Sequence, residues 1–268
     1  MPLAVCATPI GNLDDVTLRL LAELRKADVV LCEDTRQTRK LLERHDLRAK
    51  LVSYHEHNEA KRVREILPRL EAGERVALLS DAGLPAVSDP GARLIAAALE
   101  AGVPVTVLPG PSAVETALVA SGLAGERYQF IGYLPRGERA LEQLWEELAR
   151  WPHVVVAFEA PRRLPASLAS LARTQPTRPV AVCRELTKRF EEVVRGDAEE
   201  VAARFTEPPK GEITLVLGAA APAVDEPDDE ALAAVAELVD AGLGRRQAAD
   251  LVSRLTRVPR NRLYRGSL

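Results

Sequence analysis

The sequence predicts an α/β protein with two domains, followed by a small helical module. Short apolar runs alternate with segments of helical periodicity, as in sheets of parallel strands. The alternation pauses near residues 122–125 and then restarts, and a later stretch rich in alanine and proline precedes a segment without strand-like runs. These breaks predict domains at 1–122 and 123–218, a linker at 219–227 and a helical module at 228–268.

The composition is ordinary for a folded soluble protein, with 47% hydrophobic and 28% charged residues among 268. Cys6, Cys32 and Cys183 each lie in an apolar run, so we expect reduced, buried thiols and neither disulfides nor a zinc site. No signal-peptide pattern and no apolar run of roughly 18 residues is present, so we expect no membrane segment.

The first domain is predicted to alternate five strands with five helices. Thr17 is the expected N-cap of the first helix, and Asp89 that of the fourth, with Pro90 in its first turn. The expected strands are 3–8, 29–32, 50–53, 76–79 and 104–108, and the expected helices are 18–27, 38–44, 59–72, 92–99 and 112–121.

The connection at 80–91 is the strongest candidate for a binding loop. It follows a buried strand, and open α/β sheets bind ligands at the carboxyl ends of their strands. Gly83 would let the backbone approach a ligand closely, while Asp81 and Asp89 offer hydrogen-bond acceptors. Because most βα loops are only about two to six residues long, a binding loop is favoured over an ordinary capped connection.

Two further strand ends carry polar residues. Residues 33–36 (EDTR) follow the second strand, where they form either a site or simply an acidic helix N-terminus. Residues 109–113 (PGPSA) precede a helix, whose unpaired N–H groups and Ser112 hydroxyl would face a ligand. His55 and His57 lack a third ligand at metal-site spacing, so we expect no metal.

The second half restarts the alternation and ends in a basic tail. Its expected strands are 128–131, 154–158, 180–183 and 212–217 with an extended piece at 191–195, and its expected helices are 138–149, 164–172 and 197–205. The tail is predicted to form helices at 229–241, 247–255 and 258–264.

The whole-chain charge of −3 conceals this tail, because an acidic stretch at 225–230 precedes it. Residues 245–268 hold a single acid, Asp250, against seven arginines: Arg245, Arg246, Arg254, Arg257, Arg260, Arg262 and Arg265. The pattern fits a module of the helix-turn-helix type that binds nucleic acid, or a helical cap over the second domain.

Missing motifs count against NTP hydrolysis, a standard dinucleotide-binding fold and a serine hydrolase. The sequence has no Walker-type phosphate loop, no G-x-G-x-x-G after the first strand and no nucleophile elbow. Loops from two α/β domains that carry Gly, Pro, Asp and Ser suit a cofactor held largely by backbone groups in a cleft.

A set of motifs, in order along nearly the whole chain, closely resembles the ribosomal RNA small subunit methyltransferase I family of the tetrapyrrole methylase superfamily. The motifs are 9–13 (PIGNL), 33–36, 80–91, 109–113, 132–136 (GYLPR), 184–188 (RELTK) and 210–212 (KGE). The resemblance implies S-adenosylmethionine-dependent methylation of a cytidine ribose 2′-hydroxyl in the decoding region of 16S rRNA. It implies the two-domain tetrapyrrole-methylase fold (class III SAM methyltransferase), with the cofactor between the domains, and a cytoplasmic homodimer acting on 16S rRNA or the assembled small subunit.

The resemblance also implies which residues bind the cofactor, with the turn at 9–12 beside the reacting methyl group. They are Pro9, Gly11, Asp81, Ala82, Gly83, Pro85, Ser112, Ala113, Phe158, Glu159, Glu212, Ile213 and Thr214. Leu84 replaces a threonine that is frequent in the family. The family's usual Glu-Ser-Pro-His-Arg is here 159–163 (EAPRR), which excludes a catalytic role for that histidine.

Methyl transfer to a hydroxyl needs alignment and removal of a proton. Glu33, Asp34 and Asp89 are candidate bases or orienting groups, and Arg36 and Lys188 are candidate clamps for phosphate or ribose. The alternative for each of them is a helix cap or an intramolecular salt bridge. We expect Asp34 or Glu33 to contact the target ribose. The expected RNA-binding residues are Lys188, Arg245, Arg246, Arg254, Arg257, Arg260 and Arg262.

Two other functions remain open at this point. One is a small-molecule methyltransferase acting on a tetrapyrrole of the precorrin type, although such a substrate would not need an arginine-rich tail. The other is a non-catalytic RNA-binding factor that retains the fold, and such a protein would not bind S-adenosylmethionine.

Overall fold

A computed structural model describes residues 2–220, 229–256 and 258–267. The chain forms two compact units, Met1–Ala220 and Ala221–Leu268, and each is described by itself. Most of the predicted linker, much of the acidic stretch and Arg257 lie outside the described residues. The further division of the first unit at residue 122 stays a prediction.

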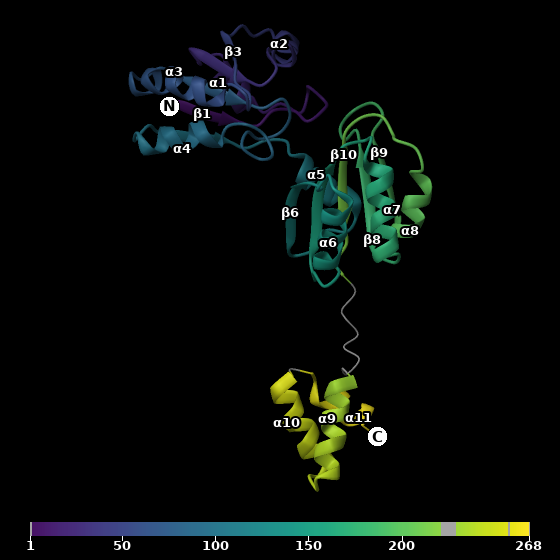
Figure 1. Ribbon diagram of the computed structural model, residues 1–268. Helices are drawn as coiled ribbons and strands as arrows, with labels where there is room; N and C mark the ends of the chain where they lie inside the picture. The colour runs from purple at the N-terminus through teal and green to yellow at the C-terminus, as the bar shows by residue number, and fades with distance from the viewer. Residues whose placement is uncertain (1, 221–228, 257, 268) are drawn as a thin grey trace. The chain divides into compact units, whose positions relative to one another are not determined.

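The first sheet contains five parallel strands in the order β3-β2-β4-β1-β5. Figure 1 labels β1 and β3 of this sheet, with α1, α3 and α4 beside it. Every residue of β1, β2 and β4 is buried, as expected for parallel strands that are covered on both faces. The loops that follow these strands open at one edge of the sheet. The strands are β1 (Leu3–Cys6), β2 (Val29–Cys32), β3 (Leu51–Ser53), β4 (Val76–Leu79) and β5 (Val105–Leu108).

Helices cover both faces of this sheet. Leucines of α1 (Leu18–Leu24) and α2 (Thr35–Arg44) pack on one face. Apolar residues of α3 (Glu59–Glu71) and α4 (Ala92–Glu100) pack on the other. The cap predicted at Thr17 is confirmed, because its side chain accepts a hydrogen bond from the Leu20 N–H.

One predicted helix start and one predicted helix cap are wrong. Helix α2 begins at Thr35, three residues before the expected start at 38, because Asp34 supplies the N-cap. Helix α4 begins after Gly91, whose φ of 144° only glycine adopts easily, so Asp89 is not its cap. The Asp89 carboxylate is thereby left for another role.

The second sheet is mixed, in the order β6-β7-β10-β8-β9, and only β6 and β7 are parallel to each other. Helices α6, α7 and α8 cover one face, and α5 packs on the other. The elements are α5 (Ala113–Ser121), β6 (Tyr128–Tyr133), α6 (Glu138–Leu148), β7 (Val154–Glu159), α7 (Leu164–Thr174), β8 (Pro179–Arg184), β9 (Glu192–Asp197), α8 (Ala198–Arg204) and β10 (Ile213–Leu217).

The second unit is a small helical bundle of α9 (Asp229–Asp240), α10 (Arg245–Thr256) and α11 (Arg260–Gly266). Val235, Ala248 and Leu263 form its core together with neighbouring alanines and valines. Among the residues that the structure describes, in either unit, no helix is both long and apolar enough to cross a membrane.

Candidate functional site

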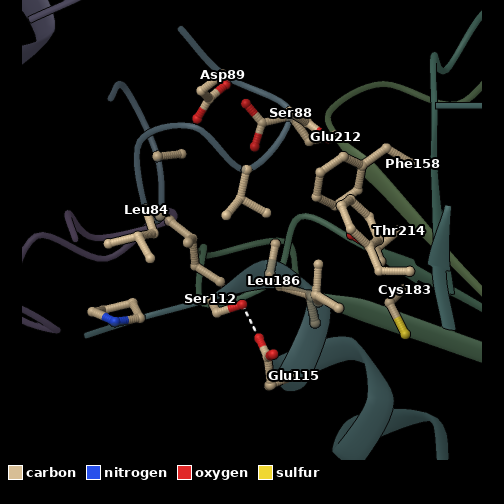
Figure 2. A pocket seen from close by; sticks show the side chains of 18 of the residues that line it. Leu84, Ser88, Asp89, Ser112, Glu115, Phe158, Cys183, Leu186, Glu212 and Thr214 are labelled. Carbon is tan, nitrogen blue, oxygen red and sulfur yellow. Dashed lines mark hydrogen bonds between the residues drawn. The ribbon is translucent and has the colours of Figure 1, made fainter. Parts of the chain in front are cut away.

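A cavity of about 770 Å³ lies in the first unit, where loops from both sheets meet (Figure 2). Its walls come from the β4–α4 loop, the turn before α5, the strand β6, the end of β7 and the start of β10. The structure brings most of the predicted cofactor residues together here, along with one predicted catalytic residue. These are Asp81, Ala82, Gly83, Asp89, Ser112, Ala113, Phe158, Glu159, Glu212, Ile213 and Thr214.

Other predicted site residues do not line this cavity: Pro9, Gly11, Pro85, Glu33, Asp34, Arg36 and Lys188. Gly11 has a packing role instead. A Cβ atom at this position would lie 2.5 Å from the Lys188 Cγ and 2.7 Å from the Thr187 Oγ1. The glycine therefore allows the first-strand turn to pack closely against the β8–β9 loop.

The β4–α4 loop is fixed to the end of the first strand. The Thr8 N–H donates to the Gly83 carbonyl at 2.8 Å, and the Gly83 N–H donates to the Thr8 carbonyl at 3.1 Å. The Ser80 hydroxyl also donates to the Gly83 carbonyl, at 3.1 Å. Gly83 has a φ of 76°, in the left-handed region that favours glycine. The loop thus presents a preformed backbone surface to the cavity.

Asp89 lines the cavity and has a raised pKa that suits it to accepting a proton. Burial raises the pKa of Asp89 to about 6, and the charges of Glu33 and Asp81 add to this rise. A general base works best when its pKa lies near the working pH. The Asp89 carboxylate is mostly ionised at neutral pH and still basic enough to take up a proton.

Asp34 is occupied by local interactions. Its carboxylate caps α2 by accepting from the Arg36 N–H at 2.8 Å, and it also pairs with the Arg36 guanidinium at 2.6 Å. Hydrogen bonds from Arg36 lower the pKa of Asp34 to about 2. The Asp34 N–H in turn donates to the Asp81 Oδ1 at 2.9 Å, so the β2–α2 loop helps to position Asp81. The sequence allowed either a site or a helix N-terminus at this position, and at Asp34 the structure shows the helix N-terminus.

Glu33 lies close enough to the cavity acids to affect them by charge. Burial raises the pKa of Glu33, and the negative charge of Asp81 contributes to the rise, whereas His55 opposes it. Because Glu33 raises the pKa of Asp89 in the same way, the acids at this edge of the first sheet form one electrostatic group.

The cavity lining is strongly acidic. Among the described residues, its lining includes no lysine, arginine or histidine. It includes five carboxylates, those of Asp81, Asp89, Glu115, Glu159 and Glu212. Two of these acids form ion pairs with residues outside the lining: Glu159 with Arg163 at 2.5 Å, and Glu212 with Lys188 at 2.9 Å. Asp81 and Asp89 have no comparable ion pair among the described residues. The lining therefore favours a ligand that carries positive charge.

Glu115 connects the two walls at the far end of the cavity. It accepts hydrogen bonds from the Ser112 hydroxyl and, at 2.7 Å, from the Tyr128 hydroxyl. In Figure 2 the Ser112–Glu115 pair lies at the opposite end of the view from Asp89 and Glu212. The cavity thus has polar groups at both ends of an apolar middle.

An aromatic cluster forms the wall contributed by the second sheet. The Phe158 ring lies 4.9 Å from the Phe130 ring and 5.5 Å from the Tyr133 ring, measured between centroids. Sequence reasoning found Phe158 but missed Phe130 and Tyr133. The GYLPR motif contains Tyr133, and the parallel pairing of β6 with β7, which the sequence does not reveal, brings it to the cavity.

The histidines do not line this cavity, and the basic tail belongs to the second unit. The rings of His55 and His57 are 6.0 Å apart, and the described residues contain no group of three or more potential ligands that could hold a metal ion. In the second unit the side chain of Arg245 is partly buried, and Arg254 pairs with Asp250 at 2.5 Å. The exposed arginines there include Arg246, Arg254, Arg260 and Arg262.

Comparisons with known proteins agree with this architecture. Residues 2–202 match the family of tetrapyrrole (corrin/porphyrin) methylases. The chain is 44% identical over 261 residues to the ribosomal RNA small subunit methyltransferase I of Micromonospora olivasterospora. The aligned region covers 96% of this chain and 83% of that protein. It is 41% identical over 271 residues to the protein of that name from Synechocystis sp., which covers 99% and 97%.

Solved structures share the fold at lower identity. The methyltransferase CobJ is 21% identical with a TM-score of 0.63, over 82% of this chain and 95% of that one. The uroporphyrin-III C-methyl transferase from Thermus thermophilus, complexed with S-adenyl homocysteine, is 24% identical with a TM-score of 0.57, over 81% and 96%. At these identities the likeness concerns the fold alone.

Proposed function

Since the chain belongs to the ribosomal RNA small subunit methyltransferase I family, within the tetrapyrrole methylases, we propose that it methylates the ribose 2′-hydroxyl of a cytidine in the decoding region of 16S rRNA. S-adenosylmethionine is the methyl donor. The observation that carries the proposal is the acidic cavity built from both sheets, because it suits a donor with positive charge.

The residues present fit this cofactor. The cavity volume of about 770 Å³ falls within the range of ~300–1,000 Å³ that is usual for small-molecule sites. When bound, S-adenosylmethionine supplies a methyl group activated by a positively charged sulfonium. The backbone at 81–83, the start of α5 with Ser112, the Phe158 ring and residues 212–214 would hold it.

The chain's own contribution to the reaction is alignment and proton removal. We assign Asp89 as the group that accepts the ribose hydroxyl proton, because it lines the cavity and its pKa is raised to about 6. Glu33 supports it by charge, and the Asp34 N–H holds Asp81 in place. Arg36, whose side chain is 85% exposed, remains a proposed contact for the RNA backbone.

On this proposal the helical unit contacts rRNA through its exposed arginines, and the protein acts in the cytoplasm as a homodimer on 16S rRNA or the small subunit. Deleting residues 221–268 is expected to weaken RNA binding and to flatten its dependence on salt. Affinity for S-adenosylmethionine should not change, because every cavity residue lies in the first unit.

The direct test uses labelled S-adenosylmethionine and small ribosomal subunits from cells that lack their own enzyme, with the label mapped by nuclease digestion and mass spectrometry. Label on a cytidine ribose is the expected result. Cofactor binding without transfer to subunits or naked rRNA would favour a small-molecule acceptor instead. Absence of cofactor binding would contradict the proposed reaction class and favour a non-catalytic RNA-binding factor.

A further inference from the structure

The loop between β8 and β9 displays a large aromatic ring to solvent. Phe190 is 65% exposed, and the Arg189 guanidinium carbon lies 5.5 Å from the centroid of its ring. An exposed aromatic ring beside a cation is the pairing that proteins use to stack on nucleobases and to contact the adjacent phosphates. Neither residue has a part in the cofactor cavity.

The backbone of this loop is held in an unusual conformation. Glu185 has a φ of 52° and Thr187 a φ of 64°, both in the left-handed region that non-glycine residues seldom adopt. The Thr187 N–H donates to the Glu191 carboxylate at 2.6 Å, and the Asn12 N–H donates to the Thr187 hydroxyl oxygen at 3.0 Å. Strain that is held by several contacts is typical of functional segments.

Lys188 braces the loop. Its ammonium group donates to the Glu185 carboxylate at 2.8 Å and to the Glu212 carboxylate at 2.9 Å. These hydrogen bonds raise the pKa of Lys188, although burial acts in the opposite direction. Two carboxylates thus occupy the side chain that the sequence suggested as an RNA contact. Lys188 is better placed to hold the loop rigid than to bind a phosphate.

The loop lies between the cofactor cavity and the open surface. Leu186 lines the cavity, whereas the next three residues, 187–189, line a separate open hollow with the turn at 11–14 and Arg44. A nucleotide next to one that enters the cavity would therefore meet this surface. Because the loop is already held in one conformation, a base could stack on the Phe190 ring without the entropic cost of ordering the loop.

We propose that Arg189 and Phe190 form a stacking platform for an unpaired rRNA nucleobase that flanks the target cytidine, an inference that rests on the proposed function. The ring stacks on the base, and the guanidinium faces the neighbouring phosphate. Every base has a stacking face, so the platform sets the position of the strand and reads little of its sequence. This contact adds a specificity for unstacked, single-stranded RNA to the methylation site.

The first test compares Phe190→Ala, Phe190→Leu and Phe190→Trp in steady-state methylation of small subunits. Loss of one stacked base is expected to raise KM for the subunit about tenfold in the Ala and Leu variants, while Trp keeps it near the wild-type value. The dissociation constant for S-adenosylmethionine should stay unchanged in all three. Leu99→Ala is the matched control, because Leu99 is 60% exposed on α4 and outside the platform.

The second test uses the Phe190→Trp variant as a direct probe. The native Trp145 is fully buried and the indole nitrogen of Trp151 is also buried, so an indole at 190 adds the most exposed emitter. Single-stranded RNA oligonucleotides should quench this emission more strongly than that of the wild type.

Three results would overturn the inference: a Leu variant as active as wild type, no quenching by RNA, or a change of oligomeric state without a change in KM. The last would identify a surface between copies of the chain. If wild-type protein methylates no RNA, the proposed function fails, whereas quenching at residue 190 still reports separately on the platform.

Discussion

Two loops at the same edge of the first sheet both carry acidic residues, yet only one reaches the cavity. The β2–α2 connection is short, so its Asp34 turns back to cap the helix and to pair with Arg36. The β4–α4 connection runs from residue 80 to 91 before its helix begins, and its Asp81 and Asp89 line the cavity. The first loop positions the second through the Asp34 N–H and the Asp81 carboxylate.

Loop length decides the difference. An acid directly before a helix meets unpaired backbone N–H groups, which bind it locally. A longer loop places its acids beyond the reach of the helix start, where they must be stabilised by other partners or by a ligand. An aspartate thus caps a helix in the short loop, at Asp34, and lines the cavity in the long loop, at Asp89.

The largest expected effect is that of Asp89→Asn. Asparagine keeps the size of the side chain but cannot take up the hydroxyl proton, so the single-turnover rate of methyl transfer should fall about 10²–10⁴-fold. Affinity for S-adenosylmethionine, measured by calorimetry, should fall far less than the rate, because four other carboxylates of the cavity lining remain. Asp34→Asn is the matched control in the shorter loop. A larger loss of the single-turnover rate in Asp34→Asn than in Asp89→Asn would contradict the assignment of the reacting acid to the longer loop.

A second test changes the backbone of the long loop. Gly83→Val places a branched side chain at a φ of 76°, and we expect S-adenosylmethionine affinity to fall about tenfold or more as the loop shifts. Gly102→Val is the control, because its φ is 71° and no atom would lie within 4 Å of its Cβ. Both variants should melt at lower temperature, but only the first should bind the cofactor more weakly. Equal affinities would contradict a role for the loop backbone.

The pH dependence gives a third, smaller effect. Since the pKa of Asp89 is raised to about 6 and the ionised form is the base, the rate should fall as pH drops through about 6 and level off above it. Glu33→Gln removes a negative charge that raises this pKa, so the midpoint should move to lower pH. A midpoint that stays fixed in this variant would show that Glu33 does not act on the base.

The smallest effect is expected at the cap of the short loop. Asp34→Ala removes the group that accepts from the Arg36 N–H, whereas asparagine at this position can still accept. The Ala variant should therefore melt at lower temperature than the Asn variant in thermal unfolding followed by circular dichroism. If both melt alike, the cap does not account for the role of Asp34.

The sequence predicted the strands and most of the cavity loops, because apolar runs and turn residues report local structure. The role of Asp34 was harder to predict, since it depends on the helix start at Thr35, and helix boundaries are the least reliable part of a prediction from sequence. Tyr133 and Phe130 could not be placed, because their position depends on how β6 pairs with β7. For Lys188 the sequence left open a contact with RNA or an intramolecular salt bridge, and the structure shows salt bridges to Glu185 and Glu212.

Hydrogen–deuterium exchange with and without S-adenosylmethionine tests the central comparison most directly. The account predicts slower amide exchange in residues 80–91 and 109–115 when the cofactor binds, and little change across 33–44. Protection centred on 33–44, with the long loop unaffected, would contradict it.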